Sequence, residues 1–101
     1  MYPRFKLNPF GVIGHGNIQG VNRTTPEQIT GLSGASDIDY VIIKADPDNS
    51  ENIHIGSSTV TTNDFQLDAG DTIEFSIKDL RNVYVLASDA SQNVQFIYFK
   101  Q

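Results

Sequence analysis

Apolar and polar residues alternate along most of the chain from residue 37 onward. The clearest case is "DTIEFSI", residues 71–77, where Ile73, Phe75 and Ile77 share one face of an extended strand and polar residues occupy the other. Turn signals separate such runs, and in "DAGD", residues 68–71, we expect Gly70 to have a positive φ. Short strands with turns about every eight to twelve residues predict an all-β fold, an antiparallel β-sandwich, which we expect to be of jelly-roll type. The other runs are "DIDYVIIKA" (37–45), "ENIHIGSS" (51–58), "VTTNDFQL" (60–67), "VYVLAS" (83–88) and "VQFIYFK" (94–100).

The last of these runs is apolar on both faces. Val94, Phe96 and Tyr98 occupy one face, and Ile97 and Phe99 occupy the other. A strand of a two-layer sandwich normally has one polar face, so the second apolar face needs a cover. Either the chain's own N-terminal segment or a neighbouring subunit supplies it, and Ile97 and Phe99 are therefore candidate interface residues.

Residues 1–36 have a different character. They hold six of the eight glycines and three of the four prolines, and their apolar residues follow no sustained period. We predict an extended N-terminal arm over residues 1–36 and a sandwich body over residues 37–101. A single helical turn is expected within the arm at "TTPEQIT", residues 24–30.

The charge of the chain limits the classes of partner that it is expected to bind. The net charge is −5, from 12 acidic and 7 basic side chains. Residues 1–36 carry +2 and residues 37–101 carry −7, so the predicted body is acidic and the predicted arm mildly basic. Nucleic-acid binding requires a cationic surface, so we expect no nucleic-acid partner. With no cysteine and no long apolar run, we expect neither a disulfide framework nor a membrane partner.

Two short motifs have a functional and a structural interpretation. "GHGNIQG", residues 14–20, lacks the strand and helix context of a dinucleotide-binding loop, so its glycines more simply permit close passage over another surface. "DPDNSE", residues 46–51, clusters carboxylates as calcium loops do, but it lacks the glycine and the distant glutamate of an EF-hand, which favours a solvated turn. The histidines, His15 in the predicted arm and His54 on the predicted polar face of the run 51–58, belong to no catalytic motif. We therefore expect no enzyme activity, no cofactor and no metal site.

The block "NIHIGSSTVTTNDFQLDAGDTIEFSIKDLRNVYVLASDASQNVQFIYF", residues 52–99, resembles a module common in small virion proteins of tailed bacteriophages. The resemblance rests on the glycine-ended run "IHIG", the hairpin "TVTTNDFQLDAGD", the pair "IEFSIKDLRNVYV" and the closing strand after "ASQNV". It implies a non-enzymatic β-sandwich that decorates or cements a capsid, located on the virion surface. It also implies a homo-trimer, with the major capsid protein and copies of the chain as partners.

In this interpretation the arm bridges neighbouring capsid subunits, with its apolar side chains in grooves between them and its basic side chains on acidic surface. A head-fibre, tail or neck component is an alternative within structural proteins. A carbohydrate-binding module is an alternative from another class, with Tyr84 and Tyr98 as a stacking platform. The predicted interface residues of the arm are Tyr2, Arg4, Phe5, Lys6, Leu7, Phe10, Val12, Ile13 and Arg23.

Overall fold

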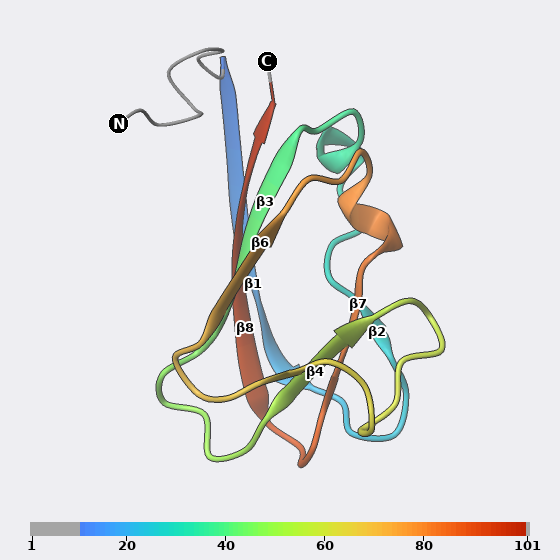
Figure 1. Ribbon diagram of the computed structural model, residues 1–101, viewed down its shortest axis with the longest axis vertical. Coiled ribbons are helices and arrows are strands. Elements are labelled where there is room, and N and C mark those ends of the chain that lie inside the picture. Colours follow the sequence, from blue (N-terminus) through green and yellow to red (C-terminus); the bar gives the residue numbers. More distant parts are fainter. Residues whose placement is uncertain (1–10, 101) are drawn as a thin grey trace.

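The computed structural model describes residues 11–100, which form two four-stranded antiparallel sheets (Figure 1). Sheet A has the strand order β1-β8-β3-β6, and sheet B has the order β2-β7-β4-β5. Helix in this part of the chain is limited to two 3-10 turns, η2 (Ser33–Ala35) and η3 (Leu80–Asn82). The all-β prediction is confirmed. The strands are β1 (Val12–Val21), β2 (Glu27–Gln28), β3 (Tyr40–Ala45), β4 (Ile53–Gly56), β5 (Gln66–Leu67), β6 (Thr72–Phe75), β7 (Tyr84–Ala87) and β8 (Gln92–Lys100).

The strand pairings follow one rule. β1 pairs with β8, β2 with β7, β3 with β6 and β4 with β5, all antiparallel. The first four strands thus run against the last four, as in one long hairpin whose tip lies between β4 and β5. Two further pairings, β3 with β8 and β4 with β7, join these pairs within each sheet.

The core lies between the two sheets and is built from alternate residues of the strands. Val41, Ile43 and Ala45 of β3 face inward and are fully buried, whereas Ile42 and Lys44 between them are half-buried on the outside. The inward residues of β4, β7 and β8 complete the core. This alternation is what a sheet with one packed face requires.

Strand β6 shows the predicted alternation, but at the edge of sheet A. Ile73, Phe75 and Ile77 pack against the core and remain half-buried, while the polar residues between them are exposed. An edge strand has a neighbouring strand on one side only, so Phe75 stays half-buried although it faces the core. Gly70, in the turn before β6, has φ +86°, as predicted.

The predicted arm is corrected over the part that the structure describes. Residues 12–21 form β1, which pairs with β8 along its length, and residues 27–28 form β2. The apolar period was not visible because two inward positions of β1 are glycines, Gly14 and Gly16. The rings of Tyr98 and Phe96 on β8 occupy the space where side chains would lie: a Cβ on Gly14 would clash with the Tyr98 ring, and one on Gly16 would lie 2.7 Å from Cζ of Phe96. Residues 1–10 of the predicted arm lie outside the described residues.

The helical turn predicted at residues 24–30 is also wrong. Glu27 and Gln28 pair with β7, and the backbone N–H of Ile29 donates to the carbonyl of Val83 at 2.9 Å. Ile29 is buried in the core. Pairing with β7 therefore satisfies the backbone and buries an apolar side chain, which outweighs the local preference for a helical turn.

We expect Ile43→Ala to lower the free energy of unfolding by about 2–5 kcal/mol, because Ile43 is fully buried. The neighbouring Ile42→Ala has the same change in size on the outer face and should cost no more than about 1.5 kcal/mol. Urea denaturation of the monomer measures both. Equal losses would contradict the register of β3.

We expect Gly14→Ala to lower the free energy of unfolding by about 1–3 kcal/mol, since the added methyl group would overlap the Tyr98 ring. Gly31→Ala is the matched control, because a Cβ there meets its nearest neighbour, Oε1 of Gln28, at an ordinary 3.6 Å. The control should be neutral or slightly stabilising in the same urea titration. A neutral Gly14→Ala would refute the close packing of β1 on β8.

Candidate binding surface on sheet A

The outer face of sheet A changes from apolar to polar along the strands. Three strands present one row of outward residues, Ile13 of β1, Phe99 of β8 and Tyr40 of β3. The second row, two residues further along each strand, consists of His15, Ile97, Ile42 and Glu74. The third row consists of Asn17, Gln95, Lys44 and Thr72. We call Ile13, Tyr40, Ile42, Ile97 and Phe99 the apolar end.

The apolar end contains the predicted body interface residues. Ile97 and Phe99 are half-buried, and Ile13 is 60% exposed. The rings of Tyr40 and Phe99 are in contact, with centroids 6.3 Å apart and planes tilted by 40°, and the Tyr40 hydroxyl donates to Oε1 of Glu74. This end therefore combines ordered aromatic rings with exposed aliphatic surface.

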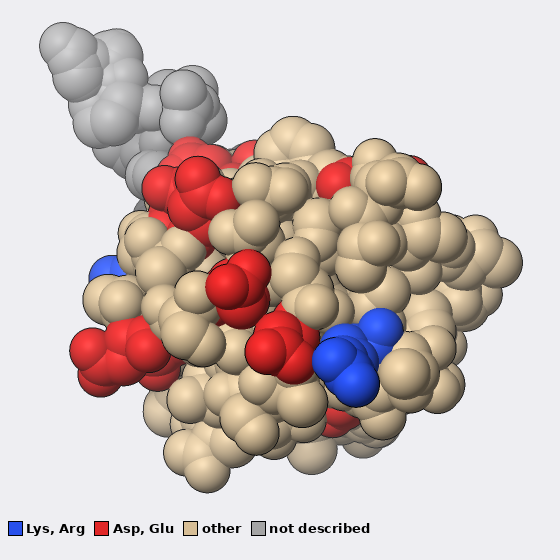
Figure 2. All heavy atoms as spheres, turned by 90° about the horizontal axis from the view of Figure 1, so that it is seen from below, with Lys and Arg blue, Asp and Glu red and all other residues tan. Residues whose placement is uncertain are grey.

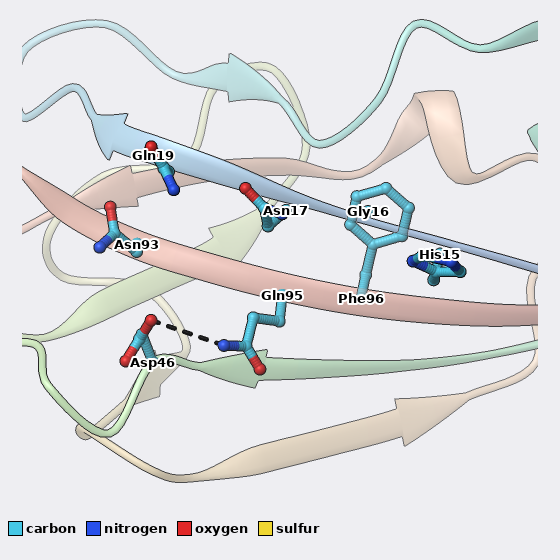
Figure 3. Close-up of a pocket in the computed structure, with 8 residues that line it drawn as sticks. All are labelled: His15, Gly16, Asn17, Gln19, Asp46, Asn93, Gln95 and Phe96. Atoms are coloured by element: carbon cyan, nitrogen blue, oxygen red, sulfur yellow. Dashed lines mark hydrogen bonds between the residues drawn. The ribbon is translucent and has the colours of Figure 1, made fainter.

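The polar side of the same face forms a hollow of about 380 Å³ (Figure 3). Its side chains come from β1, from β8 and from the residue that follows β3, and Gly16 and Phe96 complete its lining. We call this hollow the polar groove. Its polar residues are His15, Asn17, Gln19, Asp46, Asn93 and Gln95.

Hydrogen bonds to β8 hold the loop that carries Asp46. The side chain of Asn49 accepts a bond from the N–H of Asn93 at 2.7 Å and donates to the carbonyl of Asn93 at 2.8 Å. The buried Gln92 accepts from the N–H groups of Ser50 and Glu51 through Oε1 and donates to Oγ of Ser50 and the carbonyl of Ala90 through Nε2. These bonds fix the loop against the start of β8.

Two residues of the groove wall are held individually. Oδ1 of Asp46 accepts from the N–H of Asp48 at 2.9 Å, and Oδ1 of Asn93 accepts from the N–H of Gly20 at 3.0 Å. "DPDNSE" is thus a hydrogen-bonded turn. Across residues 11–100, no group of three or more His, Cys, Asp or Glu residues is placed to hold a metal ion.

The remaining side chains of the groove keep their hydrogen-bonding capacity. His15, Asn17 and Gln19 are exposed, and their side chains make no hydrogen bond within the described part of the chain. Nε2 of Gln95 lies 3.5 Å from Oδ2 of Asp46, at the limit of a hydrogen bond. Figure 3 shows the Asn17 and Gln19 side chains on β1 and those of Asn93 and Gln95 on the adjacent β8.

The spacing of polar residues in the sequence is a signal for the groove, although it was not used to predict a site. Polar residues recur at every second position in residues 15–19 and again at residues 93 and 95. In strands this spacing places them on one face, but Gly14 and Gly16, at inward positions of the same segment, concealed the strand.

His54 is buried, contrary to its predicted place on a polar strand face. It is 2% exposed, its Nδ1 lies 3.2 Å from the carbonyl of Asp64, and its Nε2 lies 2.8 Å from Oγ of Ser88. The segment between β4 and β5 covers it. A serine bonded to a histidine is the arrangement of nucleophile and base, but a ring this inaccessible cannot meet a substrate, so the pair fastens the covering segment.

The tyrosine platform proposed for a carbohydrate-binding module is contradicted. Tyr98 is 7% exposed and lies on the inner face of sheet A, whereas Tyr84 is half-buried on β7 of sheet B. The two rings belong to different sheets and do not form a common exposed surface.

The structure places the predicted interface residues of the arm in different positions. Val12 begins β1, Ile13 belongs to the apolar end, and Arg23 pairs with Asp89 of the same chain at 3.4 Å, with both side chains 60% exposed. The other predicted residues, Tyr2, Arg4, Phe5, Lys6, Leu7 and Phe10, lie outside the described residues.

Charge on the described surface is uneven. Figure 2 looks onto the lower end of the sandwich in Figure 1 and shows several acidic side chains with few basic ones among them. Loops that follow β3, β5 and β7 carry acidic residues. At the corner before β7, the side chain of Arg81 donates two hydrogen bonds to Asp79 and its N–H a third, and these bonds hold the pKa of Asp79 below its ordinary value.

We expect His54→Ala to lower the free energy of unfolding by about 2–4 kcal/mol, because it removes a buried ring and leaves its polar partners without a bond. Ser88→Ala should cost about 0.5–1.5 kcal/mol. His15→Ala, at the exposed histidine, is the control and should change the value by less than about 0.5 kcal/mol. A His54 variant as stable as the His15 variant would contradict the fastening role.

Comparison of the chain with protein-family models, with curated proteins and with solved structures gives no match. Among residues 11–100, no helix has the length and apolar character needed to cross a bilayer. The resemblance of residues 52–99 to phage virion modules therefore stays a prediction, and the function has to be inferred from the surfaces described above.

Proposed function

We propose that the chain is a non-enzymatic virion structural protein of a tailed bacteriophage, a decoration or cement protein at the capsid surface. The observation that carries this proposal is the apolar end of sheet A, where Ile13 is 60% exposed and Ile97 and Ile42 are half-buried. Exposed apolar patches on small proteins generally mark sites of protein association. A small domain that exposes such a patch gains stability when a neighbour covers it.

The strand order supports the same proposal. We infer a jelly roll from the pairing of the first four strands with the last four in reverse, divided between two sheets. Jelly rolls build viral capsid and lectin domains. A fold alone does not determine function, so the strand order adds to the argument from the surface and does not replace it.

A second copy of the chain is the occupant that we assign to the apolar end. The patch is aliphatic and aromatic, so it complements itself across a symmetry axis without pairing like charges from the acidic loops. The resemblance adds that three copies assemble. Residues 1–10 precede β1 and include Arg4, Lys6 and the predicted apolar interface residues Tyr2, Phe5, Leu7 and Phe10, and in this proposal they contact the major capsid protein.

Copy number in purified virions tests the location. A decoration protein should be present in hundreds of copies by quantitative mass spectrometry, as expected for a component of a repeated shell. A few copies would instead identify a head-fibre, tail or neck component, built from the same domain.

We expect the double variant Ile13→Ser, Ile97→Ser to be monomeric under conditions in which the wild-type chain is an oligomer, because it removes aliphatic contact area from both strands of the apolar end. Analytical ultracentrifugation measures the change. Phe65→Ser is the control, since Phe65 is 57% exposed but lies outside sheet A, and it should leave the oligomer intact.

Deletion of residues 2–10 should leave the sheets folded, since β1 begins at Val12. The truncated chain should no longer co-sediment when it is added to capsids that were prepared without the protein. A wild-type chain that is monomeric at all concentrations, or a truncated chain that occupies capsids fully, would refute the corresponding part of the proposal.

A further inference from the structure

The polar groove contains a set of side chains with a particular chemistry. Asn17, Gln19, Asn93 and Gln95 each carry an amide, which offers a donor group and an acceptor group in one plane. Asp46 adds a carboxylate, and no Lys or Arg among residues 11–100 lines the hollow. We propose that this groove binds a neutral saccharide, a function distinct from the assembly proposed for the apolar end.

Sugar hydroxyl groups fit this arrangement because each one both donates and accepts a hydrogen bond. A planar amide or carboxylate can engage two neighbouring hydroxyls at once, one through each of its polar atoms. Asn17 and Gln19 on β1 and Gln95 and Asp46 on the other side of the hollow leave such atoms available. The hollow, about 380 Å³, lies within the usual range for small-ligand sites.

The groove continues onto an apolar surface, which a sugar also requires. A second hollow of about 210 Å³ adjoins the first, shares Gln95 and Phe96 with it, and is also lined by Ile42, Lys44, Thr72 and Ile97. The C–H face of a sugar ring is apolar, so one sugar unit bonded to the amides would place the next unit over these isoleucines. On a single copy of the chain two or more units therefore fit better than one, whereas a second copy that covers the apolar end would leave room for the unit in the polar groove.

Charge disfavours other ligand classes in the polar groove itself. Among the described residues, Lys44 lines the adjoining hollow but no Lys or Arg lines the groove, so an anionic ligand there would meet the Asp46 carboxylate, in a chain of net charge −5. A hard metal ion generally requires several oxygen ligands from carboxylates, and among residues 11–100 Asp46 is the one carboxylate that lines the groove. A neutral ligand rich in hydroxyls avoids both difficulties.

Two residues of the groove wall, Asp46 and Asn93, are held in place before a ligand arrives. Asp46 is held by the N–H of Asp48, and Asn93 is held by Asn49 on one side and Gly20 on the other. Side chains that are already fixed lose little entropy on binding. Gln95 has to exchange a bond of 3.5 Å to Asp46 for a bond to the ligand, which costs little.

The experiment is an NMR titration of the full-length, ¹⁵N-labelled chain with neutral gluco-, galacto- and manno-oligosaccharides. We expect at least one of them to shift the side-chain amide signals of Asn17 and Gln95 and the backbone signals of residues 15–19 and 93–95. Asn17→Ala and Gln95→Ala should each weaken that binding about tenfold, the range for hydrogen bonds lost from a binding site. Asn63→Ala, an exposed amide outside the groove, is the control and should bind as the wild type does.

Three results would overturn the inference. The first is the absence of any shift up to about 10 mM saccharide, since binding weaker than that is not specific recognition. The second is binding that Asn17→Ala and Gln95→Ala leave unchanged, which would place the site elsewhere. The third is stronger binding of a sialylated oligosaccharide or of calcium ions than of every neutral saccharide. The spectra themselves report whether each variant is folded, and none of these results depends on capsids, so failure here leaves the assembly proposal standing.

Discussion

Sheet A depends on the contact between two glycines of β1 and two aromatic rings of β8. Tyr98 and Phe96 lie nearly parallel, with centroids 6.4 Å apart, and cover the backbone at Gly14 and Gly16. The rings supply the apolar volume that β1 lacks, so a strand with glycine at two inward positions still closes the core. Any larger residue at Gly14 would displace the ring, and with it the strand that presents one wall of the polar groove.

The same contact explains which parts of the fold the sequence reveals. Strands β3 and β6 carry their own apolar side chains on the inward face, so the apolar run of residues 37–45 and the alternation of residues 71–77 were sufficient to predict them, and the turn at Gly70 followed from its residue types. β1 was missed because its core-filling atoms belong to β8, about 80 residues away in the chain. His54 was misplaced for a related reason: its strand was recognised, but the segment that covers it is defined by tertiary contacts.

The polar groove was not predictable from local pattern because its walls come from three separate segments. Residues 15–19, Asp46 and residues 93–95 meet only through the pairings of β1 with β8 and of β3 with β8. Gln92 and Asn93 then connect the loop after β3 to the start of β8. A polar side chain that satisfies several backbone groups in a buried position determines loop geometry more sharply than apolar contacts do, because an unmade bond there is costly.

The outer face of sheet A has two parts, the apolar end and the polar groove, while the inner face of the same strands packs against the core in both parts. Inward residues of β8 remain buried from Val94 to Tyr98, while the outward residues pass from Gln95 through Ile97 to Phe99. Because side chains alternate between faces, the outward positions can change in polarity while the inward ones keep the packing constant. In our proposals one end associates with another copy of the chain and the other binds a hydroxyl-rich ligand, and a substitution in one surface need not alter the other. The two surfaces meet at Ile97 and Ile42. If both proposals hold, the size of a bound saccharide is limited by how far a neighbouring copy extends over these residues.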